Sequence, residues 1–132
     1  MNLIEIASDE QATDEEVRER AKTSKKAART KHYIVCEDHC EVAFLSLDLI
    51  PDVDYLVLYE IFVPKRLRGR GIGTRLLTEV ERVAKSNEYQ RITLTPWPLD
   101  PDYPEEKLVS WYERCGFKER LDCPSELEKW IS

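Results

Sequence analysis

One short segment has the residue types and spacing of an anion-binding turn. From Arg68 to Thr74 the chain reads RGRGIGT, and Lys65 and Arg66 add positive charge just before it. The preceding run, Tyr55 to Val63, is rich in β-branched and aromatic residues, and after the segment apolar residues recur at helical spacing as far as about Ser86. Glycine leaves the first N–H groups of a helix uncovered, and the helix dipole attracts an anion there. The sequence therefore predicts a phosphate-binding turn between a strand and a helix.

Two common phosphate-binding patterns do not fit the spacing of these glycines. A dinucleotide-binding Gly-x-Gly-x-x-Gly would need its third glycine where the chain has Thr74 or Leu76. A P-loop needs a lysine directly after its last glycine, and no glycine of this chain is followed by lysine. The pattern that remains is Arg68-x-x-Gly71-x-Gly73.

A second block lies further along the chain, where Trp111 to Phe117 reads WYERCGF. Together, in this order, the two blocks resemble the signatures of the GNAT superfamily of N-acyltransferases. The first is similar to its acyl-CoA pyrophosphate loop, with the valine-ended strand before it and the helix after it. The second is similar to its aromatic-Tyr-x-x-x-Gly-Phe helix end. The resemblance covers Tyr55 to Phe117 by motif and the rest of the chain by the order of its elements.

The resemblance implies that acetyl-CoA is the co-substrate and that no metal is needed. The pyrophosphate of acetyl-CoA would be held by the glycine turn, its arginines and the start of the helix, namely Arg68, Gly69, Arg70, Gly71, Ile72, Gly73 and Thr74. The pantetheine arm would pair like an added strand with the exposed edge of Ile61, Phe62 and Val63.

Tyr112 is the residue that the resemblance implies as the general acid. It would face the sulfur and protonate the departing thiolate, which suits a phenol with an ordinary pKa of ~10. The alternative is a core aromatic residue whose hydroxyl is hydrogen-bonded within the fold.

Glu60 is the candidate general base. The acceptor amine must be neutral to attack, so a base has to take its proton. Some GNAT enzymes have a carboxylate at this place on the central strand, where it acts directly or through water. The alternative is a strand glutamate that faces outward; His32 and His39 are further candidates for the base.

Hydrophobic periodicity predicts a mixed α/β fold for a single domain of residues 1–132, with antiparallel strands followed by a β-α-β unit and helices on both faces of the sheet. The resemblance implies that the β-α-β unit binds acyl-CoA. The expected strands are Leu3–Ala7, His32–Glu37, Cys40–Leu49, Tyr55–Val63, Arg91–Thr95, Phe117–Leu121 and Leu127–Ile131. The expected helices run from about Glu15 to Thr30, from the glycine turn to about Ser86, and from Glu105 to Cys115. One N-terminal helix, where the family usually has two, would leave the acceptor site open.

The loop from Pro96 to Pro104 holds four prolines, which exclude regular structure. It follows the strand Arg91–Thr95, which should run parallel to Tyr55–Val63, and a cleft is expected where the carboxyl ends of two such strands diverge. The loop is either a simple connector or a wall of the acceptor pocket, built from Trp97 and Tyr103.

The net charge of −6 argues against a general nucleic-acid or membrane-surface protein and favours a cationic substrate. No apolar run reaches the ~18 residues of a membrane span, and the N-terminus lacks the features of a secretion signal. We therefore expect a cytoplasmic protein with reduced cysteines. Cys36, His39 and Cys40 could supply half of the ligands of a metal site. A tetrahedral site needs more ligands, and the other two cysteines lie in the C-terminal third, so Cys36 and Cys40 fit better as neighbours on either side of a tight turn.

The resemblance implies an N-acetyltransferase that moves an acetyl group directly from acetyl-CoA to a primary amine, as a monomer or a homodimer. One alternative is a non-catalytic acyl-CoA-binding domain that acts as a sensor or partner-binding module. Another is a nucleic-acid-associated protein that uses the basic residues between Arg18 and Lys31. Acidic residues lie among and just before them, so a solvated helix face fits this segment better.

Overall fold

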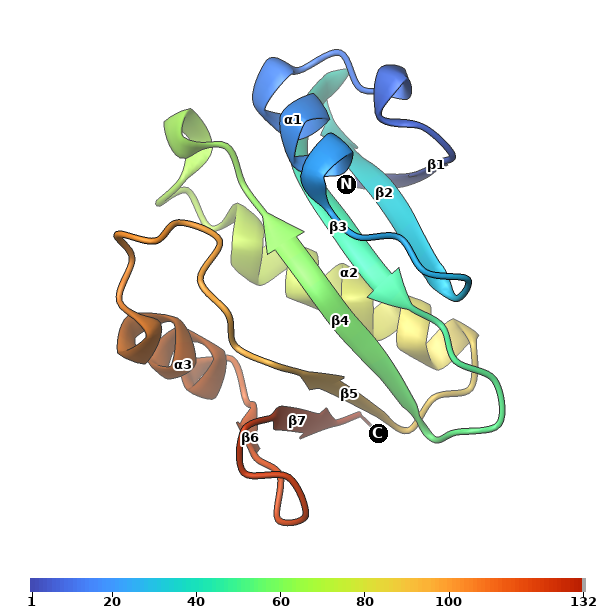
Figure 1. The fold of residues 1–132 in the computed structure, drawn as a ribbon, viewed down its shortest axis with the longest axis vertical. Coiled ribbons are helices and arrows are strands. Elements are labelled where there is room, and N and C mark those ends of the chain that lie inside the picture. The colour runs from blue at the N-terminus through green and yellow to red at the C-terminus, as the bar shows by residue number, and fades with distance from the viewer. Residues whose placement is uncertain (132) are drawn as a thin grey trace.

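The computed structural model describes residues 1–131 and contains one seven-stranded mixed sheet with helices on both faces (Figure 1). The strand order is β1-β2-β3-β4-β5-β7-β6, and within residues 1–131 β4 and β5 are the one pair of parallel neighbours. The strands are β1 Asn2–Ile6, β2 Thr30–Glu37, β3 Cys40–Asp48, β4 Tyr55–Phe62, β5 Arg91–Leu94, β6 Lys118–Glu119 and β7 Leu127–Trp130. The helices are α1 Glu15–Thr23, α2 Ile72–Ser86 and α3 Glu105–Arg114, with 3₁₀ turns at η1 Asp9–Gln11 and η2 Lys65–Leu67. The predicted fold class and element order are confirmed.

The core consists of two apolar layers, one on each side of β3. All residues from Val42 to Leu47 in that strand are buried. Val17 and Ala21 of α1 pack with Phe44 on one face, whereas α2 packs against the other face, which includes Leu45. In Figure 1, α1 lies in front of the sheet and α2 behind it. The centre of the sheet is therefore rigid and can position residues on the neighbouring strand β4.

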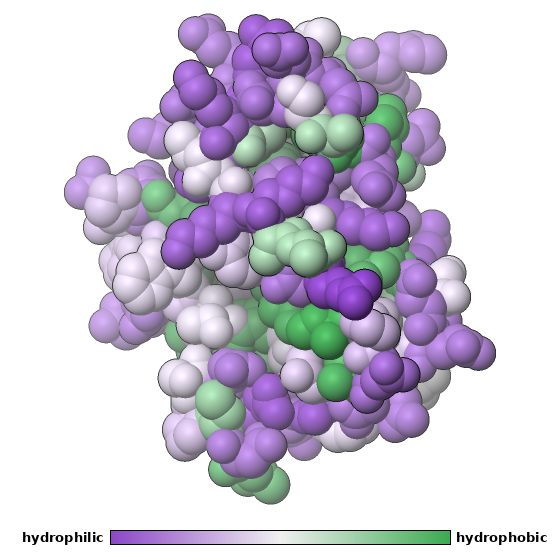
Figure 2. Space-filling view, turned by 45° about the vertical axis from the view of Figure 1, so that its right-hand side comes forward, coloured by the Kyte–Doolittle hydropathy of each residue, from purple (hydrophilic) through white to green (hydrophobic). Residues whose placement is uncertain are grey.

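Hydrophilic side chains cover most of the molecular face in Figure 2, and apolar ones are exposed near the middle of that face, bordered by hydrophilic ones. Within residues 1–131, no helix has both the length and the hydropathy that crossing a membrane requires.

A β-bulge interrupts β4 at Tyr59. Leu47 of β3 lies opposite Leu58, but the adjacent Ser46 lies opposite Glu60, so that Tyr59 is an extra residue on β4. Such bulges bend a strand and redirect its side chains, and they are common beside functional sites.

The bulge reverses which side chains of β4 face each helix layer. Beyond it, Phe62 packs into the α1 layer and Glu60 pairs with a side chain of α1. Ile61 and Val63 pack against the α2 layer instead. The bulge therefore brings a carboxylate under α1 while the apolar edge of β4 continues on the other face.

β4 and β5 pair only at the beginning of β4, from Tyr55 opposite Arg91 to Val57 opposite Thr93. Beyond Val57 the two strands diverge, because β5 ends at Leu94 while β4 continues to Phe62. In the described chain no strand pairs with this part of β4 on the β5 side, so an edge with free backbone groups faces the gap. The cleft expected from two diverging parallel strands is present.

The N-terminal helix is shorter than predicted, because α1 ends at Thr23 and not at Thr30. After Thr23 the residues from Lys25 to Arg29 are all exposed, so a longer helix would have no apolar face to bury. Thr30 begins β2 and donates its hydroxyl hydrogen bond to Asp48. The basic residues from Arg18 to Lys31 therefore do not lie on a single helical surface.

Smaller differences concern helix and strand ends. Asparagine tolerates the left-handed conformation, so Asn87 is the residue expected to adopt it after α2, but the structure has Glu88 there instead, with φ of 63°. Proline is favoured at the first helical position, where Pro104 is expected, but Pro104 is instead the N-cap of α3. Gly116 ends α3 with φ of 100°, as predicted, and β6 covers only part of the expected Phe117–Leu121.

Asp14 connects α1 to the turn that precedes α2. Its carboxylate accepts a 3.0 Å hydrogen bond from the Val17 N–H as the N-cap of α1, and it forms an ion pair with Arg66. Partial burial opposes ionisation, but these partners outweigh it and lower the pKa of Asp14. The stabilisation is therefore complete above the usual pKa of an aspartate and is lost as the pH falls through the lowered value.

We expect Asp14→Ala to lower the free energy of unfolding by about 1–2 kcal/mol, because it removes the cap and the ion pair together. Urea denaturation near neutral pH measures this change. Asp14→Asn is the matched control, since asparagine also caps helices, and it should cost less than the alanine variant. Equal stability of wild type and Asp14→Ala would show that the cap does not stabilise α1.

Candidate active site

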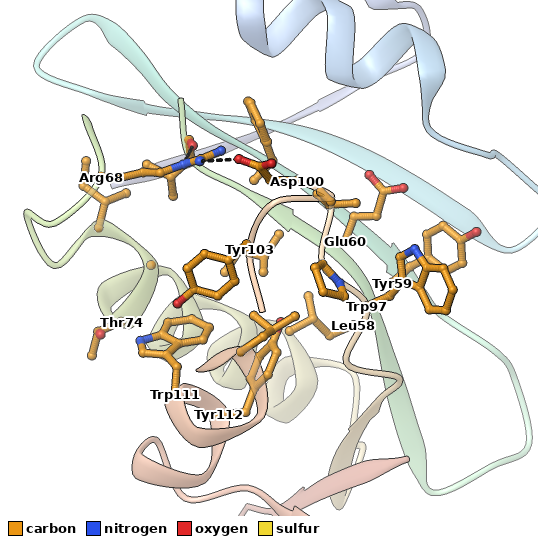
Figure 3. Close-up of a pocket in the computed structure, with 18 of the residues that line it drawn as sticks. Leu58, Tyr59, Glu60, Arg68, Thr74, Trp97, Asp100, Tyr103, Trp111 and Tyr112 are labelled. Carbon is orange, nitrogen blue, oxygen red and sulfur yellow. Dashed lines mark hydrogen bonds and ion pairs between the residues drawn. The ribbon is translucent and has the colours of Figure 1, made fainter. Parts of the chain in front are cut away.

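A cavity of about 850 Å³ opens where β4 and β5 diverge (Figure 3). Four segments form its walls: the edge of β4, the turn from Leu67 to Thr74, the loop between β5 and α3, and α3 itself. The glycine turn, the candidate acid Tyr112 and the candidate base Glu60 therefore border one cavity, although they come from distant parts of the chain.

The glycine turn is open toward solvent. Gly69 and Gly71 have φ of 81° and 77°, and a Cβ at either position would meet no atom within 4 Å. Gly71 is the N-cap of α2 and no side chain caps that helix end. The first N–H groups of α2 are therefore free of side-chain partners, as an anion site requires.

Gly73 has a different role from the two glycines before it. A Cβ on Gly73 would lie 3.1 Å from Cζ2 of Trp111, which is closer than side chains normally pack. This glycine therefore lets α3 approach the start of α2. Ile72 is buried beneath the turn and Thr74 is exposed, and both line the cavity.

The arginines of the turn differ in what they contact. Arg68 donates a 2.8 Å hydrogen bond from Nε to the Val63 carbonyl and lies 3.9 Å from the Asp100 carboxylate, with its guanidinium 5.7 Å from the centre of the Phe62 ring. Arg70 is exposed, does not line the cavity, and has no ion pair within residues 1–131. Arg68 thus crosses from the turn to the opposite loop, and Arg70 extends from the turn into solvent.

The predicted pantetheine edge lines the cavity with all three of its residues, Ile61, Phe62 and Val63. It belongs to the part of β4 that β5 does not pair with. An extended molecule with amide groups could therefore form strand-like hydrogen bonds along this edge.

Tyr112 lies on α3 and is 5% exposed, with its ring packed between Trp111 and Phe117 at centroid distances of 4.9 Å and 5.4 Å. Burial raises the pKa of Tyr112, and the neighbouring Cys115 adds to the effect. The phenol is therefore protonated at neutral pH. It lines the cavity and forms no hydrogen bond with another residue of the described chain, so its proton is available to a bound molecule.

Glu60 also lines the cavity, and its side chain is only 10% exposed. An outward-facing strand glutamate is therefore ruled out. The Nε atom of Arg20, on α1, lies 3.1 Å from Oε2 of Glu60. Burial raises the pKa of Glu60, while Arg20 and the Ser24 hydroxyl oppose that rise. The net effect is a carboxylate that is more basic than usual and whose ionised form has a fixed partner.

The two histidines lie elsewhere, so neither is placed to act as the base. His32 is buried on β2 with Nε2 3.2 Å from the Lys25 carbonyl, and burial lowers its pKa. His39 is in the β2–β3 turn with φ of 67°. Neither lines the cavity. Within residues 1–131, no cluster of three or more His, Cys, Asp or Glu side chains could hold a metal ion.

Several cavity residues were not singled out in the sequence. Tyr59 reaches the cavity because it is the bulged residue, and Asp100 because its loop folds back toward Arg68. Arg20 does not line the cavity itself but contacts Glu60 from α1. The proline content of the loop did point to Trp97 and Tyr103, and both line the cavity. The loop is therefore more than a connector.

A model of the acetyltransferase (GNAT) family matches residues 2–117 of the chain. A search of curated proteins found no match.

Solved structures share the fold at low sequence identity. An IAA acetyltransferase from Bacillus cereus has a TM-score of 0.65 and 14% identity, covering 98% of this chain and 99% of its own. The PaiA N-acetyltransferase from Thermoplasma acidophilum, in complex with coenzyme A, has a TM-score of 0.61 and 19% identity over 88% of this chain and 68% of its own. A GNAT family acetyltransferase from Elizabethkingia anophelis with acetyl-CoA bound has a TM-score of 0.61 and 15% identity, covering 89% of this chain and 84% of its own.

Proposed function

The chain belongs to the GNAT acetyltransferase family, and we propose that it transfers an acetyl group directly from acetyl-CoA to a primary amine. The observation that carries this proposal is that one cavity joins the open glycine turn, the unpaired edge of β4, Tyr112 and Glu60. These are the parts that binding a thioester and moving two protons would need.

In this proposal the start of α2 binds the pyrophosphate of acetyl-CoA. The free N–H groups after Gly71 and the positive end of the helix dipole supply the attraction. Arg70 adds a charge that has no partner within residues 1–131. The edge of β4 from Ile61 to Val63 then directs the pantetheine arm toward Tyr112. No bound metal is required for any of these contacts.

Glu60 and Tyr112 move the two protons of the reaction. Glu60 takes a proton from the amine nitrogen, directly or through water, as that nitrogen bonds to the thioester carbonyl carbon. Tyr112 gives its phenol proton to the sulfur as the carbon–sulfur bond breaks. Atoms and charges balance, because the amide and the free thiol of CoA are formed as one proton is gained by Glu60 and one is lost by Tyr112.

The experiment that tests this function is a thiol-release assay of the purified protein with acetyl-CoA and a panel of amines. We expect release that depends on both the protein and an amine, above the hydrolysis seen without amine. Calorimetric binding of acetyl-CoA without amine-dependent release across the panel would instead support the non-catalytic acyl-CoA-binding module.

Arg20→Gln tests the role of Glu60 through the pH dependence of kcat/KM for the amine. Arg20 lowers the pKa of Glu60, so removing its charge should raise that pKa further. Because the base must be deprotonated to act, the acidic limb of the profile should move to higher pH.

Lys22→Gln is the matched control, since it removes a positive charge from an exposed position on the same helix. Its acidic limb should coincide with that of wild type. An unchanged acidic limb in Arg20→Gln, with the fold retained, would exclude Glu60 as the group that titrates there.

A further inference from the structure

Two large aromatic side chains are exposed at one end of the cavity. Trp97 is 74% exposed and Tyr59 is 43% exposed, and both line the cavity. They come from separate elements, Trp97 from the β5–α3 loop and Tyr59 from the bulge in β4. Neither ring pairs with another aromatic ring in the described part of the chain. Exposed apolar surface of this kind in a cavity usually marks a binding site.

The position of these rings separates them from the glycine turn. In Figure 3, Arg68 and Thr74 lie at one end of the cavity, and Tyr59 and Trp97 lie at the other, with Glu60 beside them. If the pyrophosphate occupies the glycine turn, the aromatic end remains for the acceptor. The acceptor amine would then lie next to the carboxylate that takes its proton.

The charges that line the cavity are already paired. Its charged residues are Glu60, Arg68 and Asp100. Glu60 pairs with Arg20, and Arg68 pairs with Asp100. The lining therefore offers no unpaired carboxylate to a second ammonium group of the acceptor, and no unpaired cation to a phosphate on it.

We infer that the acceptor is a primary amine on an aromatic body, an arylalkylamine, which binds against Tyr59 and Trp97. This inference rests on the proposed acetyl transfer and names its substrate class. Burial of a flat apolar body against two rings provides binding energy without any charge, and the amine end reaches Glu60. The net charge of the chain favours a cationic substrate, and an arylalkylamine fits that expectation with a single positive charge, on the amine that is acetylated. The paired carboxylates of the cavity provide no partner for a second one.

The test compares kcat/KM for three acceptors with wild-type protein and saturating acetyl-CoA: 2-phenylethylamine, spermidine and a lysine-containing peptide. We expect 2-phenylethylamine to be preferred by about tenfold or more, the factor that corresponds to ~1.4 kcal/mol of aromatic contact. Preference for spermidine or the peptide overturns the inference and leaves the acetyl transfer intact. Transfer to none of the three, with other amines of a wider panel accepted, also overturns it; no transfer to any amine overturns the proposed function as well.

Variants of the two rings locate the acceptor. Trp97→Ala and Tyr59→Ala should each raise KM for 2-phenylethylamine about tenfold, and Tyr59→Phe should retain a near-normal KM because it keeps the ring. The Kd for acetyl-CoA should not change in any of them. Trp130→Ala is the control, since Trp130 is 51% exposed on β7 and lies outside the cavity. Unchanged KM values in both alanine variants would overturn the assignment of these rings to the acceptor.

Discussion

Replacement of Tyr112 with phenylalanine should lower kcat by about 10²–10⁴, the usual range for a positioned acid or base. The ring packs between Trp111 and Phe117, and phenylalanine keeps those contacts. The hydroxyl has no hydrogen-bond partner within residues 1–131, so its loss should not reduce stability by the ~0.5–1.5 kcal/mol of a typical hydrogen bond. The expected pattern is therefore a large loss of rate with unchanged Kd for acetyl-CoA and unchanged melting temperature.

Measurement of kcat, Kd and Tm on this one variant separates an acid from a structural tyrosine. A structural role would appear as a lower Tm with kcat near that of wild type. If kcat stays within a few-fold of wild type and Tm is unchanged, the thiolate obtains its proton from water, and Tyr112 only shapes the cavity.

Gly71→Asp should weaken acetyl-CoA binding by about a hundredfold or more, because like charges brought together cost several kcal/mol. The new carboxylate would stand at the start of α2, where the N–H groups are free and the space around Gly71 is open. It would occupy the positive helix end and repel the pyrophosphate. Calorimetry measures the affinity, and circular dichroism checks that the fold is retained.

Gly71→Ala separates the charge from the backbone effect. Gly71 has φ of 77°, which strains any side-chain-bearing residue, so alanine imposes similar strain without the charge. We expect the alanine variant to bind acetyl-CoA clearly better than the aspartate variant. Wild-type affinity in Gly71→Asp would mean that the pyrophosphate does not lie at this turn.

The sequence predicted the order of elements and the glycine turn because both depend on local patterns. The β-branched and aromatic run in β4, the helical spacing in α2 and the stop at Gly116 are properties of neighbouring residues, and the structure confirms these elements. The predicted end of α1 was wrong, because composition alone does not show that the residues from Lys25 to Arg29 have no apolar face to bury and stay exposed. Tertiary contacts decide such ends.

The cavity was only partly predictable, since its details depend on contacts between distant segments. Nothing local marks Tyr59 as a bulged residue; the register of β3 against β4 makes it one. The pairing of Arg20 with Glu60 joins α1 to β4 across the sheet face, and the pairing of Arg68 with Asp100 joins two loops. These pairs give the cavity its balanced charge, which the net charge of the chain did not indicate.

The most direct test of acetyl transfer is to quantify free CoA and acetylated amine in the same reaction. Wild-type protein, acetyl-CoA and an accepted amine are mixed, and both products are measured over time by mass spectrometry. Direct transfer predicts that free thiol and N-acetylated amine appear in equal amounts, and that neither appears at a comparable rate with Gly71→Asp. Free CoA that accumulates without acetylated amine, or no CoA release with any amine, would contradict it.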